Sequence, residues 1–172
     1  MIGVYLGHGA SGNAASMAPY VDGLRARGVD AHPLELPRRR AEDAVPALVA
    51  QIPVGGRVVV GGHSYGGRVA SLAAAGPLAD RVAALVCLSY PLHRPGAPDT
   101  AAARTAHWSS IGCPVLLLSG ESDPFARIDL LRDAVRRLPQ ATLVTWPRLG
   151  HGLRPVLDEV VERVAAFVAG LG

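Results

Sequence analysis

The stretch Val60-Gly61-Gly62-His63-Ser64-Tyr65-Gly66-Gly67 decides the fold of this chain. Within it, Gly62, Ser64 and Gly66 form the pattern G-x-S-x-G. A sharp strand-to-helix turn of this kind holds the serine in a strained conformation and leaves its hydroxyl at the end of the sheet. Small residues are needed two positions before and after the serine because backbone segments almost touch there. The pattern therefore indicates a nucleophilic serine at position 64.

Outward from this turn, short apolar runs alternate with helical patterns along the chain. Apolar strands separated by helices predict a parallel sheet covered on both faces. Pro33 lies inside the second strand and favours an outer position for it. The predicted strands are Ile2–Leu6, Val29–Leu36, Arg57–Gly61, Val82–Ser89, Val115–Ser119 and Thr142–Trp146. The predicted helices are Ala14–Arg27, with Asn13 or Ser11 as its N-cap, Glu42–Gln51, Tyr65–Ala75, a short Ala101–Trp108, Ala126–Leu138 and Pro155–Leu171.

No linker or repeat interrupts the pattern, so residues 1–172 are expected to form a single domain. Hydrophobic residues make up 49% of the chain and charged residues 18%, a composition that excludes intrinsic disorder. The apolar runs are far shorter than the roughly 20 residues of a membrane span. The long connection Pro91–Gly112 is the one exception to tight turns, and such connections are often functional.

The charge and cysteine content narrow the class of partner and the compartment. The formal charge is +3, and aromatic residues are only 5%, too few for stacking single-stranded nucleic acid. The one basic cluster, Arg38-Arg39-Arg40, is followed by Glu42 and Asp43 and is interpreted as a solvated loop and helix start, so no nucleic-acid partner is expected. Cys87 and Cys113 are no disulfide framework, and no basic leader follows the first residue. A cytoplasmic protein with two free, non-catalytic thiols is expected.

Two further segments contain the partners that a nucleophilic serine requires. Asp123 follows the fifth predicted strand in Leu118-Ser119-Gly120-Glu121-Ser122-Asp123-Pro124, where Glu121 is the alternative carboxylate. His151 lies between two glycines after the last strand. Taken alone, Asp123 fits a turn residue before proline and His151 fits a solvated loop. Together with Ser64 they stand in the order serine, acid, histidine, each just beyond the carboxyl end of a strand, and this favours a catalytic triad.

A competing signal follows the first strand. Gly7-His8-Gly9-Ala10-Ser11-Gly12 reads as G-x-G-x-x-G before a helix, and Glu35 ends the next strand, which is nearly the fingerprint of a dinucleotide site. In a hydrolase, the same glycines let the backbone approach an oxyanion. The N–H groups of Ala10 and Tyr65 would then form the oxyanion hole. The dinucleotide interpretation leaves the serine, acid and histidine unexplained, so we favour the hydrolase.

The motifs GHSYGG, SGESDPF, LGHG and GHGASGN resemble the α/β-hydrolase superfamily over essentially the whole chain. The segments GHGASGN, GGRVAS and LSYPLHRPG look more narrowly like a compact branch related to dienelactone hydrolases. The resemblance implies a triad at Ser64, Asp123 and His151 and a doubly wound α/β fold with six parallel strands in the order 2-1-3-4-5-6. A dinucleotide fold would instead place strand 4 beside strand 1. Compared with larger members, this chain lacks the first two strands and has no room for a cap domain, which argues against lipase-like specificity.

Four more side chains near the expected site remain to be assigned. His8 and His63 flank glycines at strand ends and are expected to pack without reacting. His93 and Arg94 follow the fourth strand and are possible substrate-binding residues, although surface positions are the simpler interpretation. The expected activity is a serine hydrolase that cleaves a small ester or related acyl substrate, with no metal or cofactor. The alternatives are a nucleotide-binding protein that uses the Gly7–Gly12 loop and a non-catalytic protein of this fold that binds a partner.

Overall fold

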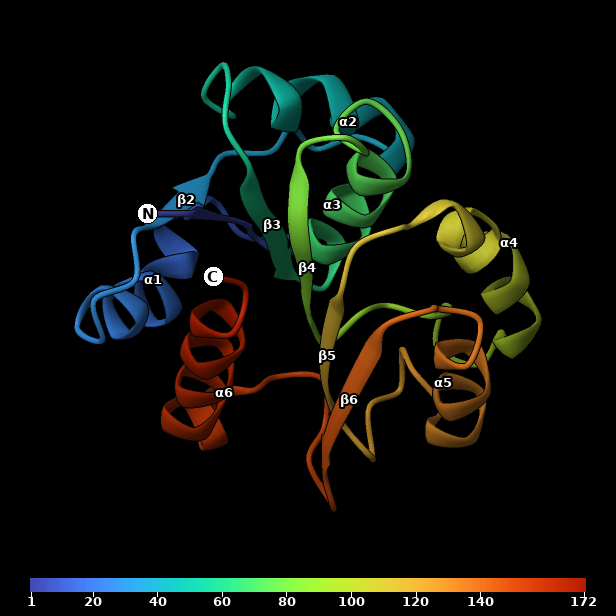
Figure 1. Cartoon of the computed structure of the whole chain (residues 1–172). Coiled ribbons are helices and arrows are strands. Elements are labelled where there is room, and N and C mark those ends of the chain that lie inside the picture. The colour runs from blue at the N-terminus through green and yellow to red at the C-terminus, as the bar shows by residue number, and fades with distance from the viewer.

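The computed structural model describes residues 1–172, and its six strands form one parallel sheet (Figure 1). The strands are β1 (Gly3–Gly7), β2 (Ala31–Leu34), β3 (Val58–His63), β4 (Val82–Leu88), β5 (Val115–Gly120) and β6 (Ala141–Trp146). Their order in the sheet is β2-β1-β3-β4-β5-β6, and every neighbouring pair is parallel. The predicted order is therefore confirmed. Because β4 lies beside β3 and not beside β1, the order that the dinucleotide interpretation requires is absent.

Helices cover both faces of this sheet, as an all-parallel sheet requires. One face packs against α1 (Ala18–Arg25) and α6 (Leu157–Ala169). The other face packs against α2 (Ala41–Ala50), α3 (Tyr65–Ala75) and α5 (Ile128–Val135). Figure 1 shows α1 and α6 side by side although they come from opposite ends of the chain. The two apolar clusters on the two faces fix the sheet, so the loops at its carboxyl edge are held in place.

The prediction of one continuous helix over Ala14–Arg27 was wrong. Residues Ala14–Met17 form a 3₁₀ turn capped by Asn13, and α1 begins only at Ala18. Pro19 explains the break because proline has no N–H to donate and therefore fits the first turn of a helix. The strand predicted over Val29–Leu36 is also shorter, and β2 lies at the edge of the sheet, the outer position that Pro33 favours.

The long connection between β4 and β5 is packed against the sheet. It contains a 3₁₀ turn at Pro98–Thr100, the short helix α4 (Ala101–Thr105) and a second 3₁₀ turn at Ala106–Ser110. The Tyr90 hydroxyl donates to the carbonyl of Arg104 at 2.7 Å, and the indole N–H of Trp108 donates to Tyr90 at 3.3 Å. Tyr90 and Trp108 are both fully buried. These contacts fix the position of Arg104 relative to the sheet.

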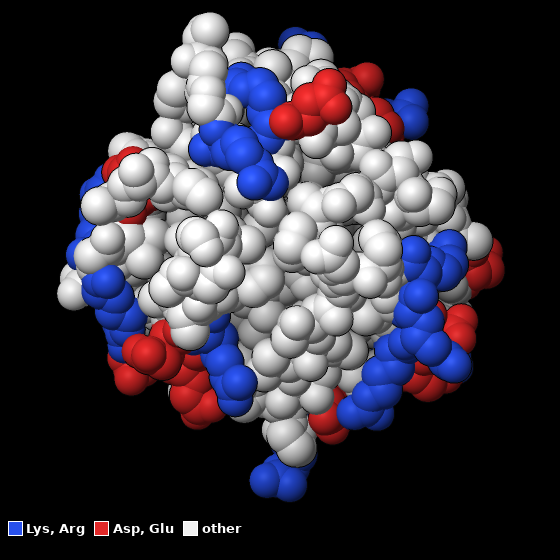
Figure 2. All heavy atoms as spheres, viewed as in Figure 1, with Lys and Arg blue, Asp and Glu red and all other residues white.

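Charged side chains of both signs lie beside one another on the face of the molecule shown in Figure 2. The excess of arginine therefore does not form one continuous basic surface there. Cys87 and Cys113 are both free, as predicted, and the structure buries both of them. None of the helices combines the length and the apolar character that crossing a membrane would demand.

Candidate active site

Ser64 lies in the turn between β3 and α3 in a strained backbone conformation. Its φ and ψ are 50° and −116°, an unusual region for a residue other than glycine. The Ser64 N–H donates to the carbonyl of Leu88 on the neighbouring strand at 2.8 Å, which fixes the turn. A Cβ atom on Gly66 would collide with the backbone of Gly7 at the end of β1. The start of α3 thus packs directly on β1, the close approach for which the G-x-S-x-G spacing selects.

The structure brings Ser64, His151 and Asp123 into one hydrogen-bonded chain. His151 Nδ1 lies 2.8 Å from Asp123 Oδ2, and His151 Nε2 lies 2.8 Å from Ser64 Oγ. An ionised carboxylate can only accept, so Nδ1 carries the hydrogen in this pair. A neutral imidazole then has Nε2 free to accept from the serine hydroxyl. This geometry suits a base that removes the proton of Ser64.

The loop after β6 reaches Asp123 because it packs closely on the end of β5. A Cβ atom on Gly120 would collide with the carbonyls of Leu149 and Gly150. The Ser122 N–H also donates to the carbonyl of Leu149 at 2.9 Å. Gly120 therefore permits the approach of the histidine loop to the acid loop. This role of Gly120 depends on a contact between two loops and was not predicted from the sequence.

The Asp123 carboxylate is completely buried, whereas 23% of the His151 side chain is exposed. The other carboxylate oxygen of Asp123, Oδ1, accepts from the N–H of Phe125 at 2.8 Å. Glu121, the alternative acid, points elsewhere and accepts from the Thr145 hydroxyl at 2.7 Å and from Arg132 at 3.2 Å. Of the two carboxylates, only Asp123 bonds to His151.

Two rings contact His151. The Phe125 ring lies 4.4 Å from the imidazole, centroid to centroid, and the His63 ring lies at 5.4 Å. Burial lowers the pKa of His63, and the neighbouring His151 acts in the same direction. Both effects favour the neutral form of His63. Phe125 was not singled out in the sequence, and no local signal indicates its contact.

The predicted oxyanion amides, on Ala10 and Tyr65, both line the space beside Ser64. The Tyr65 amide opens α3, and the first N–H groups of a helix have no partner within it. The loop that carries Ala10 is anchored by His8, which is buried and accepts from the N–H of Leu36 at 2.9 Å. Glu35, the acid of the dinucleotide interpretation, accepts from the N–H of Ala14 at 2.8 Å and so caps the following turn.

His93 and Arg94 lie apart from the space beside Ser64. His93 is 3% exposed, and its Nε2 accepts from the N–H of Arg127 at 3.0 Å. The His93 N–H donates to the carbonyl of Phe125 at 3.0 Å. His93 thus braces the loop that carries the acid. Arg94 is exposed, and its side chain lines none of the cavities around Ser64.

Three cavities lie at this edge of the sheet, and Ser64 lines two of them. The first, of about 500 Å³, is lined by Ser64, His151, His63, Phe125, Ser16 and the glycine loop. The second, of about 160 Å³, is lined by Ala10, Ser64, Tyr65, Arg68, Pro91, Arg104 and Phe125. The third, of about 390 Å³, is lined by Ala10, Tyr65 and Arg38, Arg39 and Arg40. The basic cluster is an exposed loop, as predicted, yet it also borders the proposed oxyanion amides.

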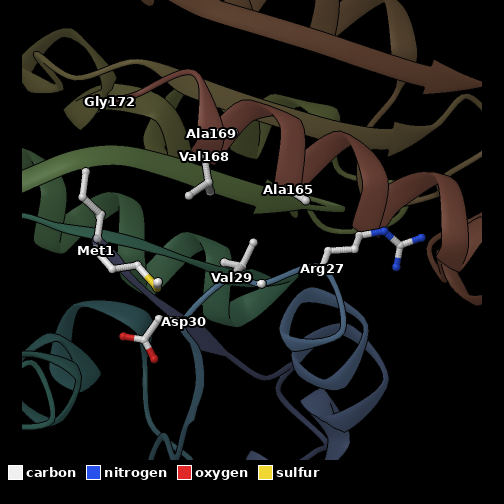
Figure 3. Close-up of a pocket in the computed structure, with 10 residues that line it drawn as sticks. Met1, Arg27, Val29, Asp30, Ala165, Val168, Ala169 and Gly172 are labelled. Atoms are coloured by element: carbon white, nitrogen blue, oxygen red, sulfur yellow. The ribbon is translucent and has the colours of Figure 1, made fainter.

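A further cavity, of about 450 Å³, lies away from this edge, between the start of the chain and α6 (Figure 3). Met1, Val29 and Val168 line it, together with Arg27 and Asp30. Arg27 is paired with two carboxylates of α6. No serine, cysteine or histidine lines this cavity. The structure has no group of three or more His, Cys, Asp or Glu side chains arranged to hold a metal ion.

Comparisons with known proteins agree with this architecture. A family model described as an alpha/beta hydrolase domain matches residues 19–164. The monoacylglycerol lipase of Paleococcus ferrophilus superposes with a TM-score of 0.85 at 15% identity, covering 99% of this chain and 95% of that one. Est1E of Butyrivibrio proteoclasticus, solved with ferulic acid, gives 0.79 at 18% identity, with coverage of 99% and 89%.

The dienelactone hydrolase of Anabaena variabilis gives a TM-score of 0.76 at 21% identity, covering 99% of this chain and 86% of that one. At these identities the similarity establishes the fold alone. The search of curated proteins found no sequence match to this chain.

Proposed function

This chain belongs to the α/β-hydrolase family, and from that membership we propose that it is a serine hydrolase acting on a small ester or related acyl substrate. The hydrogen-bonded chain from Ser64 through His151 to Asp123 carries the proposal. A serine hydroxyl is a weak nucleophile unless a base removes its proton, and the base must be held in the correct tautomer. The distances of 2.8 Å on both sides of the imidazole meet this requirement.

In the proposed reaction, Ser64 Oγ attacks the carbonyl carbon while its proton passes to His151 Nε2. The bond to the leaving alcohol then breaks, and His151 returns the proton to the alcohol oxygen. Water attacks the acyl-enzyme, His151 accepts a proton from it, and the acid leaves as that proton returns to Ser64. The sum is ester plus water giving acid plus alcohol. Asp123 keeps the ring oriented and stabilises its positive form.

The negative charge that develops on the carbonyl oxygen would be held by the N–H groups of Ala10 and Tyr65. The dipole of α3 adds to this effect because its N-terminus carries partial positive charge. The anchoring of the Ala10 loop through His8 supports this assignment, since a fixed donor costs no reorganisation during the reaction.

We propose a small substrate because the cavity that contains Ser64 and the proposed oxyanion residues is only about 160 Å³. All the elements that cover the site come from the connections of one sheet. No cap domain is inserted between the strands, and residues 1–172 fit the proposal of one domain. The β4–β5 connection is the longest, and its short helix α4 borders the site only through Arg104.

Covalent labelling with a fluorophosphonate probe tests the proposal. The purified protein should be labelled, the label should map to Ser64, and Ser64→Ala should abolish it. Ser110→Ala is the matched control because Ser110 is exposed and lies in the β4–β5 connection, outside the site. Failure of the folded wild-type protein to react with the probe would overturn the proposed activity and favour a non-catalytic role for the fold.

A further inference from the structure

The two cavities that contain Ser64 differ in charge. The larger one, called here the neutral pocket, is lined by Ser64, His151, Phe125 and the glycine loop and contains no arginine or carboxylate. The smaller one, called the arginine pocket, contains Ser64 and the proposed oxyanion residues together with Arg68 and Arg104. The nucleophile therefore stands between a neutral side and a basic side.

The arginines on the basic side outnumber the acids that could neutralise them. Glu42 pairs with Arg68 at 2.6 Å and lies 3.8 Å from Arg40. Arg104 has no carboxylate partner, and its guanidinium donates to the carbonyl of Pro91 at 3.1 Å. The buried Nε of Arg68 has no hydrogen-bond partner. This side of the site is thus supplied with donors and positive charge that the protein itself leaves unmatched.

The pKa values point the same way. Burial lowers the pKa of Arg104, and the positive charge of Arg68 lowers it further. The two guanidiniums therefore repel one another in a partly desolvated place. An anion placed between them would relieve that repulsion and accept hydrogen bonds from both, the arrangement in which charge-assisted bonds are strong. Arg38, Arg39 and Arg40 on the adjoining cavity add to the positive potential.

The position of His151 assigns the two halves of the substrate to the two pockets. Because His151 must deliver a proton to the leaving group, the leaving group has to lie where His151 lines the cavity. His151 lines the neutral pocket and not the arginine pocket. The acyl group then extends into the arginine pocket. At about 160 Å³ this pocket is smaller than the roughly 300–1,000 Å³ of sites for drug-sized ligands, so the acyl chain is short.

Building on the proposed hydrolase activity, we propose that the acyl half of the substrate carries a carboxylate, which Arg104 and Arg68 bind in the arginine pocket. The substrate class is a half-ester of a short dicarboxylic acid with a neutral alcohol. The product is then a dicarboxylate. The carboxylate holds the far end of the acyl chain and so orients the ester carbonyl over Ser64.

Four esters, two of them methyl esters and two of them acetates, compared by initial rates of acid release test this assignment. Monomethyl glutarate carries the charge on the acyl side, and methyl pentanoate is its neutral equivalent of equal acyl length. The acetate ester of 4-hydroxybutanoate carries the charge on the leaving group and is compared with butyl acetate. We expect kcat/KM for monomethyl glutarate to exceed that for methyl pentanoate by about 10- to 100-fold, the size of a charge-assisted hydrogen bond. The charge on the leaving group should bring no such gain.

Arginine variants test which side chains bind the carboxylate of the substrate. In Arg104→Met the ratio between monomethyl glutarate and methyl pentanoate should lose most of its preference, and Arg68→Met should reduce it as well. Arg163→Met is the control, because Arg163 is exposed on α6 and has no part in the site. A preference that survives in both Arg104→Met and Arg68→Met would overturn the assignment of the pocket.

A second measurement separates failure of this inference from failure of the hydrolase activity. Glutaramate, the monoamide of glutaric acid, should slow fluorophosphonate labelling of the wild-type protein at lower concentrations than its uncharged equivalent pentanamide does, whether or not the methyl esters turn over. Equal protection by the two amides, or methyl pentanoate turned over as well as monomethyl glutarate, refutes the carboxylate while the hydrolase stands. If the folded wild-type protein reacts neither with the probe nor with any ester, both proposals fail. If Arg104→Met does not fold, the wild-type competition alone decides.

Discussion

Replacing Asp123 by Asn tests the acid of the site most directly. The Asp123 carboxylate is fully buried and accepts from His151 Nδ1 and from the N–H of Phe125, both at 2.8 Å. Asn is nearly isosteric and keeps one accepting oxygen, so the bond from Phe125 can persist. Its amide nitrogen, however, would then face Nδ1 as a donor. Nδ1 would have to accept, and Nε2 would carry the hydrogen.

With Nε2 protonated, His151 cannot remove the proton of Ser64. We therefore expect Asp123→Asn to lower kcat by about 10⁴-fold, the loss seen when a buried triad carboxylate is changed to its amide. Glu121→Gln is the matched control two residues away. Its side chain is 28% exposed and bonds to Thr145 and Arg132, so the change should leave turnover nearly unaltered and cost at most about 1 kcal/mol of stability.

Both variants and the wild type are compared by initial rates on an ester that the wild type cleaves, with circular dichroism and urea unfolding as checks on folding. The comparison refutes the assignment if folded Glu121→Gln loses turnover while Asp123→Asn retains it. The carboxylate would then be Glu121, and the 2.8 Å contact between Asp123 and His151 would be a structural one.

Three other predictions follow from the same structure. Ser64→Ala and His151→Ala should each lower kcat by about 10⁶-fold. The double variant should be hardly worse than either single one because the two residues act as a unit, and a comparison of kcat for the three variants checks this. Gly66→Ala should destabilise the fold by about 2–3 kcal/mol in urea unfolding, because its Cβ collides with the backbone of Gly7, which cannot yield as a flexible side chain would; a loss below about 0.5 kcal/mol would contradict this. Burial lowers the pKa of His107 to about 4 in the folded protein. In the unfolded chain His107 has its ordinary pKa of about 6.5, so as the pH falls it is protonated in the unfolded chain first. Stability should therefore fall as the pH drops from about 6.5 to 4, and His107→Gln should flatten that fall in unfolding curves measured at each pH.

The sequence predicted correctly those elements whose bounds are set by residues close by in the chain. The helix Tyr65–Ala75 has the predicted bounds because the strained turn starts it and Gly76-Pro77 stops it. The sheet order followed from the resemblance and was confirmed. The prediction of one helix over Ala14–Arg27 was wrong because the apolar periodicity continues through Pro19, whereas proline has no N–H and restricts where α1 can begin.

Some residues of the candidate site have a local sequence signal, and others do not. Ser64, Asp123 and His151 each stand in a short motif beyond a strand end, so these motifs and their order along the chain predicted all three residues. Arg68 had a signal that was overlooked, since it lies one helical turn beyond Ser64 on α3. Arg104 had no local sequence signal, because it reaches the site only through the packing of the β4–β5 connection on Tyr90 and Trp108. Contacts made by tertiary packing leave no mark on local periodicity.

The short connections between the strands give a physical reason for a charged pocket at this site. With no domain inserted between the strands, the arginine pocket measures only about 160 Å³, so an acyl chain of a few carbons buries little area there. At about 25 cal/mol per Å² of apolar surface, such burial contributes too little to hold the ester in one orientation. A carboxylate between Arg68 and Arg104 would instead be held at a fixed distance from the nucleophile by directional, charge-assisted bonds. Because reaction rates depend on how closely the bound ester approaches its attacking geometry, orientation by charge can replace the enclosure that larger hydrolases obtain from a cap.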